Sequence, residues 1–192
     1  MNSKLNRKVA RALTATVVGG AAVFAVAAPA SAAPADCTYN PGGRGGLGSY
    51  VDGLALDHRD WEIDLANAIN TYRAQNGLAG LTYSRTLARP AMWASLDSYN
   101  RGSSPANHID SRNMNIPQRV QFCSGYTGYV GEITYWGRGT GATWQSALAW
   151  WKSSPTHNNW MLDRRSKTFA VAMAYEGEDR RRAHYTVVFG DH

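Results

Sequence analysis

The sequence predicts an α+β domain in which helices cover both faces of a mainly antiparallel sheet. Two segments, 60–77 and 142–153, repeat apolar residues at helical spacing. Segment 168–175 alternates large apolar residues with alanines, which is typical of a strand covered on both faces. Segment 184–189 follows a charged turn and reads as its hairpin partner. Helices first and a hairpin last indicate this layered arrangement.

The first helix is expected to begin at Asp60, whose side chain can cap it, and to end at Gly77. Its buried stripe consists of Trp61, Leu65, Ile69 and Tyr72. A second helix is expected from Ser84 to Tyr99. Pro90 lies inside this segment, so the helix either begins near Arg89 or kinks there.

The middle of the chain is expected to be a long loop followed by a strand, a turn and a third helix. The loop spans 102–127, the strand 129–136 and the turn 139–141. In the third helix, 142–153, one face carries Trp144, Leu148 and Trp151, which predicts burial.

The first 32 residues are expected to be a cleavable secretion signal. They begin with four basic residues and no acidic one, continue with an apolar run over 13–28, and end at 29–32 in a small-residue cleavage site. The apolar run is shorter than the roughly 20 residues of a bilayer span, so an uncleaved anchor is the weaker alternative. No later stretch is long and apolar enough to span. We therefore expect a secreted, extracellular protein with no stable membrane insertion.

The charge balance changes once the signal is removed. The whole chain carries a net charge of +6, but without the four basic residues of the signal, 16 Lys and Arg face 14 Asp and Glu, a net of +2. A charge this small does not indicate a nucleic-acid partner. We expect one domain over 59–192, a monomer, preceded by a Gly-rich arm over 33–58.

The chain contains two cysteines, Cys37 and Cys123. In an oxidising compartment such a pair predicts a disulfide, which would tie the arm to the domain. A catalytic thiol or a metal ligand is the alternative interpretation.

The common catalytic signatures are missing from the sequence, including His-Glu-x-x-His, Gly-x-Ser-x-Gly and the phosphate-binding glycine loop. A spaced set of His108, Glu132 and His157 remains. Each alone is a weak signal, because a single histidine or strand glutamate is more often structural than functional. Their order along the chain is more informative, and runs Asn70-Thr71-Tyr72-Arg73, Gly77-Leu78, His108, Arg119, Gly131-Glu132, Ser154-Pro155-Thr156-His157 and Val188-Phe189-Gly190.

This order resembles the bacterial branch of the CAP superfamily, also called the SCP or cysteine-rich secretory protein family, over roughly residues 60–189. The resemblance implies an α-β-α sandwich with a cleft lined by two histidines and acidic residues, where relatives have been found to hold divalent metal. His108 and His157 match the two family histidines. Glu132 matches the glutamate of the family's Gly-Glu-Asn motif.

Several positions depart from the family pattern. Ile133 replaces the motif's Asn, Thr156 replaces the Gly before the second histidine, and Asn158 replaces the Arg after it. The second cleft glutamate of many eukaryotic members has no counterpart within 152–154. The expected cleft therefore contains a single carboxylate.

The resemblance makes a divalent cation such as zinc the candidate cofactor, and no organic cofactor is indicated. His108 and His157 would be ligands, and Glu132 either a third ligand or an acceptor that orients an imidazole. Three further histidines match no family position: His58, His184, which is expected to be structural, and His192, which is expected to be solvated.

The chain contains seven tryptophans. Trp61, Trp144 and Trp151 are expected in the core. Trp136 and Trp160, with Arg119, are the candidates for a cleft that takes a lipid-like or glycan ligand.

Three functions remain open. A binding module for a small amphipathic or cell-envelope ligand is the leading hypothesis. The alternative is a metal-dependent hydrolase of peptide or cell-wall substrates, with Glu132 as general base. A structural envelope protein tethered by its arm is the third.

Overall fold

The computed structural model describes residue 37 and the segments 59–175 and 181–192. The predicted secretion signal, His58 and all of the predicted arm except Cys37 lie outside the described residues. No helix in the described part is long and apolar enough to cross a membrane.

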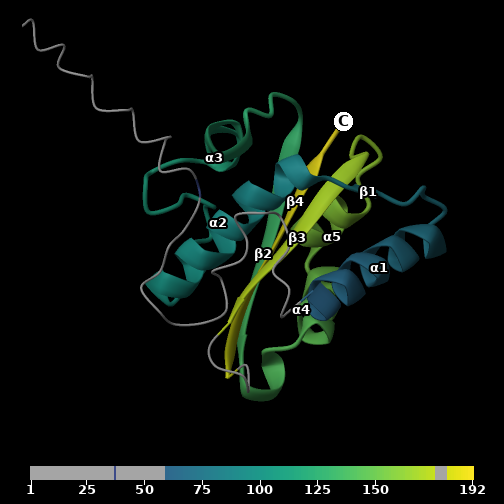
Figure 1. Ribbon diagram of the computed structural model, residues 1–192. Helices are drawn as coiled ribbons and strands as arrows, with labels where there is room; N and C mark the ends of the chain where they lie inside the picture. Colours follow the sequence, from purple (N-terminus) through teal and green to yellow (C-terminus); the bar gives the residue numbers. More distant parts are fainter. Residues whose placement is uncertain (1–36, 38–58, 176–180) are drawn as a thin grey trace, which may run out of the picture. The chain divides into compact units, whose positions relative to one another are not determined.

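A mixed sheet forms the middle layer (Figure 1). Its order is β1 (Thr82–Tyr83), β3 (Thr168–Tyr175), β4 (Arg182–Gly190) and β2 (Val130–Arg138). The β2–β4 and β3–β4 pairs are antiparallel, which confirms the mainly antiparallel prediction, while the short β1 is parallel to β3. Strand β2 therefore lies at one edge of the sheet.

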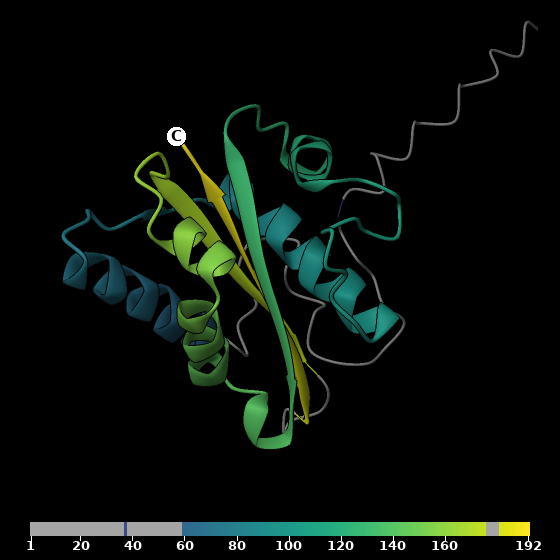
Figure 2. The ribbon, with the colours of Figure 1, turned by 180° about the vertical axis from the view of Figure 1, so that it is seen from behind.

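Helices cover both faces of this sheet (Figures 1 and 2), which confirms the α-β-α arrangement. One layer contains α1 (Arg59–Gln75), α4 (Trp144–Ser153) and α5 (Pro155–Met161). The other contains α2 (Arg85–Arg101) and α3 (Ile116–Ser124). A 3₁₀ turn, Gly139–Gly141, follows β2.

Alternation along β3 decides which layer packs on which face. Phe169, Val171, Met173 and Tyr175 face the layer of α1, α4 and α5, as predicted, and the intervening alanines face α2. Small residues on that side allow α2, which is itself rich in buried alanine, to approach the sheet closely.

Helix α2 begins at Arg85, next to the predicted start at Ser84 and four residues before the alternative start at Arg89. Ser84 caps it by accepting a hydrogen bond from the backbone N–H of Leu87, and the helix continues through Pro90. A start near Arg89 is therefore wrong. Proline is held inside the helix although its missing N–H removes one helical hydrogen bond, since both faces around it are buried.

Helix α3 lies within the segment that the sequence analysis assigned to a loop, and this assignment is wrong. Asn115 accepts a hydrogen bond from the N–H of Gln118, whose side chain accepts one from the N–H of Asn115. Pro117 sits in the first turn and Gly125, at φ 71°, ends the helix. These are ordinary start and stop signals, and they were readable in the sequence.

Two residues of the Asn70–Arg73 motif join α1 to distant segments. Asn70 exchanges two hydrogen bonds with the backbone of Leu81. Buried Arg73 donates to the carbonyl oxygens of Met161 and Asp163, at 2.7 and 3.0 Å. The motif therefore holds the end of α5, which carries His157, in place against α1.

Cys37 and Cys123 form a disulfide, as predicted, with a Cα–Cα distance of 5.3 Å. Both are buried beside Trp93. The bond fastens residue 37 to the last turn of α3.

Candidate functional site

A cleft of about 620 Å³ opens at the edge strand β2. Both helical layers contribute to it, because the loop after α2 reaches it from one side and α4 and α5 from the other. Its lining residues are Ser104, Pro105, Ala106, His108, Thr134, Tyr135, Trp136, Trp150, Thr156 and His157. The volume falls in the range of about 300–1,000 Å³ that is usual for small-molecule sites.

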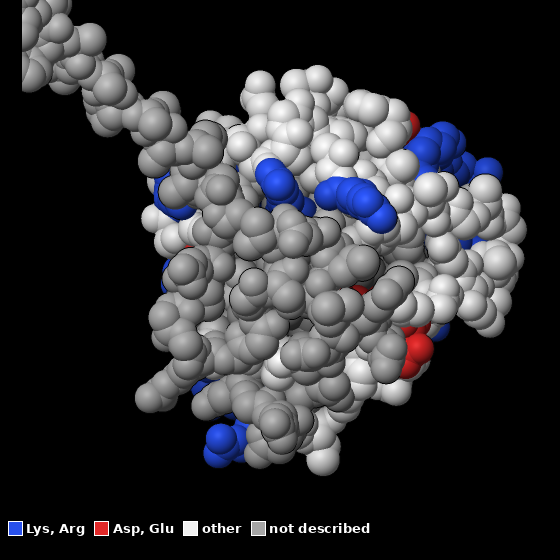
Figure 3. All heavy atoms as spheres, in the orientation of Figure 1, with Lys and Arg blue, Asp and Glu red and all other residues white. Residues whose placement is uncertain are grey.

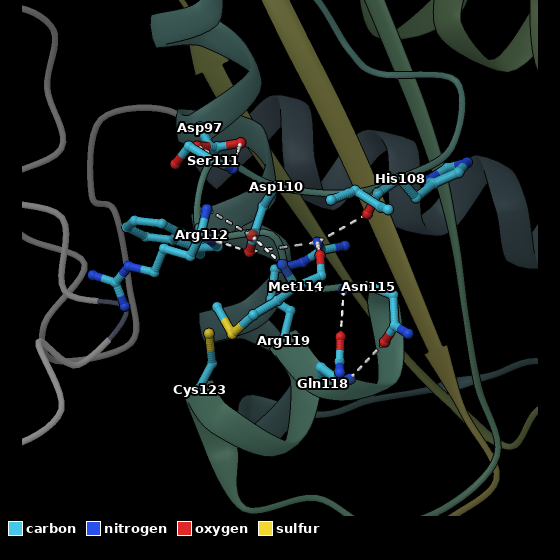
Figure 4. A network of polar contacts seen from close by, with 12 residues as sticks. Asp97, His108, Asp110, Ser111, Arg112, Met114, Asn115, Gln118, Arg119 and Cys123 are labelled. Carbon is cyan, nitrogen blue, oxygen red and sulfur yellow. Dashed lines mark hydrogen bonds and ion pairs between the residues drawn. The ribbon is translucent and has the colours of Figure 1, made fainter.

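His108 stands in the loop between α2 and α3 with an unusual backbone. Its φ is 57°, in the left-handed region that a residue with a Cβ rarely adopts. Two hydrogen bonds hold this conformation: its N–H donates to the carbonyl of Pro105, and its own carbonyl accepts from Arg119 at 3.2 Å. Figure 4 shows this last contact. Backbone strain of this kind is often found where a side chain must be aimed.

Glu132 lies buried beneath His108 and uses both carboxylate oxygens. Oε1 accepts from Nδ1 of His108 at 2.9 Å, and Oε2 accepts from the guanidinium of Arg119 at 2.6 Å. Burial tends to raise the pKa of Glu132, but the charge of Arg119 and the hydrogen bond to His108 outweigh it, so this pKa lies below its usual value. The carboxylate is therefore ionised, and it accepts a hydrogen bond from the Nδ1–H group of His108.

Arg119 is the centre of the network in Figure 4. Its side chain is 1% exposed, and it also lies 3.7 Å from the carboxylate of Asp110. Asp110 in turn accepts hydrogen bonds from the backbone of Arg112 and Met114 and from the indole of Trp93. Arg119 thus joins α3, the loop of His108 and strand β2.

His157 reaches the cleft from α5. Its Nδ1 is 2.6 Å from the hydroxyl of Ser154, and its ring centre is 4.5 Å from that of Trp150. Burial, followed by the charge of His108, lowers the pKa of His157. The ring is therefore neutral at pH 7, the form that binds metal. A hydroxyl can donate or accept, so Ser154 leaves both tautomers of His157 open.

Of the three residues that the sequence proposed as cleft contacts, one lines the cleft and two do not. Trp136 lines the cleft, with 43% of its surface exposed. Arg119 is buried behind Glu132. Trp160 is partly buried and packs against the core between Tyr129 and Phe189, over the backbone of Gly131. Neither Arg119 nor Trp160 belongs to the lining.

Sequence reasoning missed Trp150, which is 45% exposed and lines the cleft beside His157. It precedes Trp151, which is fully buried as predicted. Adjacent residues on a helix point about 100° apart, so the buried stripe itself indicated that Trp150 faces outward.

The remaining described histidines lie away from the two in the cleft. His184 is fully buried in β4 and packs on Trp136 and Tyr99. Burial, followed by the charges of nearby arginines, lowers the pKa of His184 to about 4. His192 is exposed and stacks on Tyr126.

The donor set limits how a metal could be held. Among the described residues, no group of three His, Cys, Asp or Glu side chains is placed to hold a metal ion. Two imidazoles line the cleft, one with a carboxylate and the other with a hydroxyl against its Nδ1, and such partners typically orient metal-binding histidines. Of the two roles considered for Glu132, the geometry favours the orienting acceptor.

Charged side chains lie in separate groups on the described part of one face and are absent from the described cleft lining. On the described part of the face in Figure 3, lysine and arginine side chains form separate groups between uncharged areas. Asp, Glu, Lys and Arg do not occur among the described residues that line the cleft.

One family model matches this chain over more than half of its length. Residues 66–189 match the cysteine-rich secretory protein family, CAP. No curated protein gave a significant match.

Three solved structures are similar to this chain at 13–17% identity, a level that shows the fold alone. An outer surface protein from Borrelia burgdorferi has a TM-score of 0.61 and 16% identity over 70% of this chain and 95% of its own. An extracellular protein containing a SCP domain from Bacillus anthracis has a TM-score of 0.58 and 17% identity, over 69% of this chain and 41% of its own. A cysteine-rich secretory protein from Staphylococcus aureus has a TM-score of 0.52 and 13% identity, over 72% of this chain and 40% of its own.

Proposed function

Since the chain belongs to the cysteine-rich secretory protein family, CAP, we propose that it is a secreted binding protein whose cleft takes a small amphipathic or cell-envelope ligand. Secretion is supported by the predicted signal, the buried disulfide and the outer-surface and extracellular descriptions of two structural neighbours.

One observation carries the proposal. His108 and His157 come from opposite helical layers and line one cleft together with the half-exposed rings of Trp136 and Trp150. Apolar rings with a few convergent polar groups are the usual composition of a small-molecule site.

A divalent cation such as zinc is part of the proposal. Nε2 of His108 and a ring nitrogen of His157 would hold it, and Glu132 and Ser154 would orient the two rings. With two protein ligands the affinity would be modest, and water or the organic ligand would complete the coordination.

Binding is better supported than hydrolysis. Glu132 is the general base of the hydrolase alternative, yet both of its oxygens are engaged and its pKa is lowered, by the charge of Arg119 and the hydrogen bond to His108 acting against burial. A base in that state is poorly placed to take a proton from water in the cleft.

Zinc titration by calorimetry tests the metal part. We expect saturable binding in metal-stripped wild type that disappears in the double variant His108→Ala/His157→Ala. His192→Ala is the matched control, since it removes an exposed imidazole outside the cleft, and it should bind as the wild type does. Absence of binding in the wild type, or binding retained in the double variant, would overturn the metal site.

A fluorescent amphipathic probe, anilinonaphthalene sulfonate, tests the ligand part. We expect energy transfer from tryptophan on binding, and loss of that signal in Ala106→Trp, which fills the cleft from its exposed rim. Gln145→Trp adds the same ring at an exposed position on α4 outside the lining, and should leave binding intact. Equal binding by both variants would show that the probe sits elsewhere.

A further inference from the structure

We propose that the ligand of this cleft is a short uncharged saccharide, held by ring stacking on Trp136 and Trp150. This inference rests on the proposed binding function and narrows it from amphipathic ligands in general to one chemical class.

The two indoles are the first reason. They are 43% and 45% exposed, among the most exposed large apolar side chains of the described residues. The sheet edge separates them: Trp136 lies on the side of α2, packed on His184, and Trp150 comes from α4 on the other side. A ligand in the cleft would meet an aromatic ring on each side of the sheet edge.

Both rings are held in place before any ligand arrives. Trp136 stacks on buried His184, with ring centres 6.2 Å apart and planes 16° apart. The ring centre of Trp150 lies 5.9 Å from that of Tyr135 and 4.5 Å from that of His157. Tyr135 is itself fixed, since its hydroxyl donates to the carbonyl of Gly141. Rings ordered in advance lose little entropy on binding, which favours flat stacking ligands.

The polar groups of the cleft match a sugar better than an acyl chain. Hydroxyls of Ser104, Thr134 and Thr156 stand in the lining beside two imidazoles. Each can donate or accept, as sugar hydroxyls do. A hydrocarbon chain would leave these groups unsatisfied, and burying them without partners costs free energy.

The composition of the described lining residues argues for a neutral saccharide, since none of them is Asp, Glu, Lys or Arg. The guanidinium of Arg138 lies 5.5 Å from the ring centre of Trp136, but it belongs to an exposed side chain outside the lining. A ligand with a strong negative charge would therefore find a solvated partner at the rim and none among the lining residues.

Titration with chitotetraose and cellotetraose, followed by calorimetry and by tryptophan fluorescence, tests the inference. We expect binding in the wild type, weakened about three- to tenfold in each of Trp136→Ala and Trp150→Ala, the range that ring stacking supplies. Phe122→Ala is the control, since it removes a ring 39% exposed on α3, outside the lining, and its affinity should be unchanged.

A parallel titration with lysophosphatidylcholine separates this inference from the broader proposal. If the lipid binds through Trp136 and Trp150 and neither saccharide binds, the saccharide inference is overturned and the binding function stands. If neither saccharides, the lipid nor anilinonaphthalene sulfonate binds, both are overturned. Saccharide binding that survives both tryptophan substitutions would place it outside this cleft and also overturn the inference.

Discussion

Replacing Arg119 by methionine would remove the guanidinium that holds Glu132, the carbonyl of His108 and Asp110 together. Methionine keeps the aliphatic part of the arginine side chain but is shorter and lacks the guanidinium. The single change therefore removes the ion pair and some packing, and the pH dependence and the double variant separate the two effects.

The expected loss follows from burial. Arg119 and Glu132 have side chains 1% and 2% exposed, and their charged atoms are 2.6 Å apart. Removing one partner of such a pair typically costs about 3–5 kcal/mol, because the other charge stays buried and uncompensated. This is a large part of the roughly 5–15 kcal/mol by which domains are stable.

The loss should depend on pH. In the wild type, burial tends to raise the pKa of Glu132, and the charge of Arg119 with the hydrogen bond to His108 brings it below normal. The pair therefore stabilises the fold above the ordinary pKa of a glutamate, and this contribution is lost as the pH falls through the lowered value. Without Arg119 the pKa of Glu132 should rise above normal, so Glu132 of the variant is already protonated at pH 4 and the deficit should shrink there.

Urea unfolding at pH 7 and pH 4 measures both effects. The double variant Arg119→Met/Glu132→Gln should cost less than the sum of the single changes, because it leaves no charge behind at this pair. Exposed Arg164→Met should change the free energy of unfolding by less than about 0.5 kcal/mol. A deficit equal at both pH values, or a strictly additive double variant, would refute the buried-charge reasoning.

Three further predictions concern stability. Replacing Cys37 and Cys123 by serine should lower the free energy of unfolding by up to about 4–5 kcal/mol, because the disulfide joins residues 86 apart. A reductant should destabilise the wild type in the same way. If neither the substitutions nor the reductant changes the free energy of unfolding, the disulfide is not stabilising. Gly131→Ala should cost at least about 1–3 kcal/mol, since its Cβ would lie 2.2 Å from the ring of Trp160; an unchanged thermal midpoint would rule out this packing. Between pH 6.5 and 4 the free energy of unfolding of the wild type should fall by up to about 3 kcal/mol. The pKa of His184 is lowered to about 4 in the folded protein, so the unfolded chain takes up the proton at a higher pH. His184→Leu should reduce this pH dependence, and an equally steep dependence in the variant would show that other groups cause it.

Local patterns were enough to predict most of the elements. The spacing of apolar residues identifies helices and strands, because it shows which side chains lie on the same face of an element. They located the alternating strand β3, its partner β4 and the buried stripe of α4. The helix α3 was missed although its capping residues were present, because a short helix offers few periodic positions to count.

The candidate site was predictable only as a set of residues. The order of short motifs pointed to His108, Glu132 and His157, and two cysteines after a predicted secretion signal pointed to their disulfide. Their roles were not predictable. Whether Glu132 faces the cleft or lies behind His108 depends on where Arg119 sits, and Arg119 arrives on a helix that the sequence analysis did not foresee.

The sequence by itself therefore determined the class of fold, the cysteine pair and the residue types available for chemistry, since these depend on neighbours along the chain. Tertiary structure alone decided that β2 lies at an edge, so that His108 and His157 reach one cleft from opposite layers. It also decided that Trp150 lines this cleft while Trp160 packs against the core over Gly131. The physical reason is that strand order and helix packing set the distances between residues far apart in sequence, and no local pattern contains those distances.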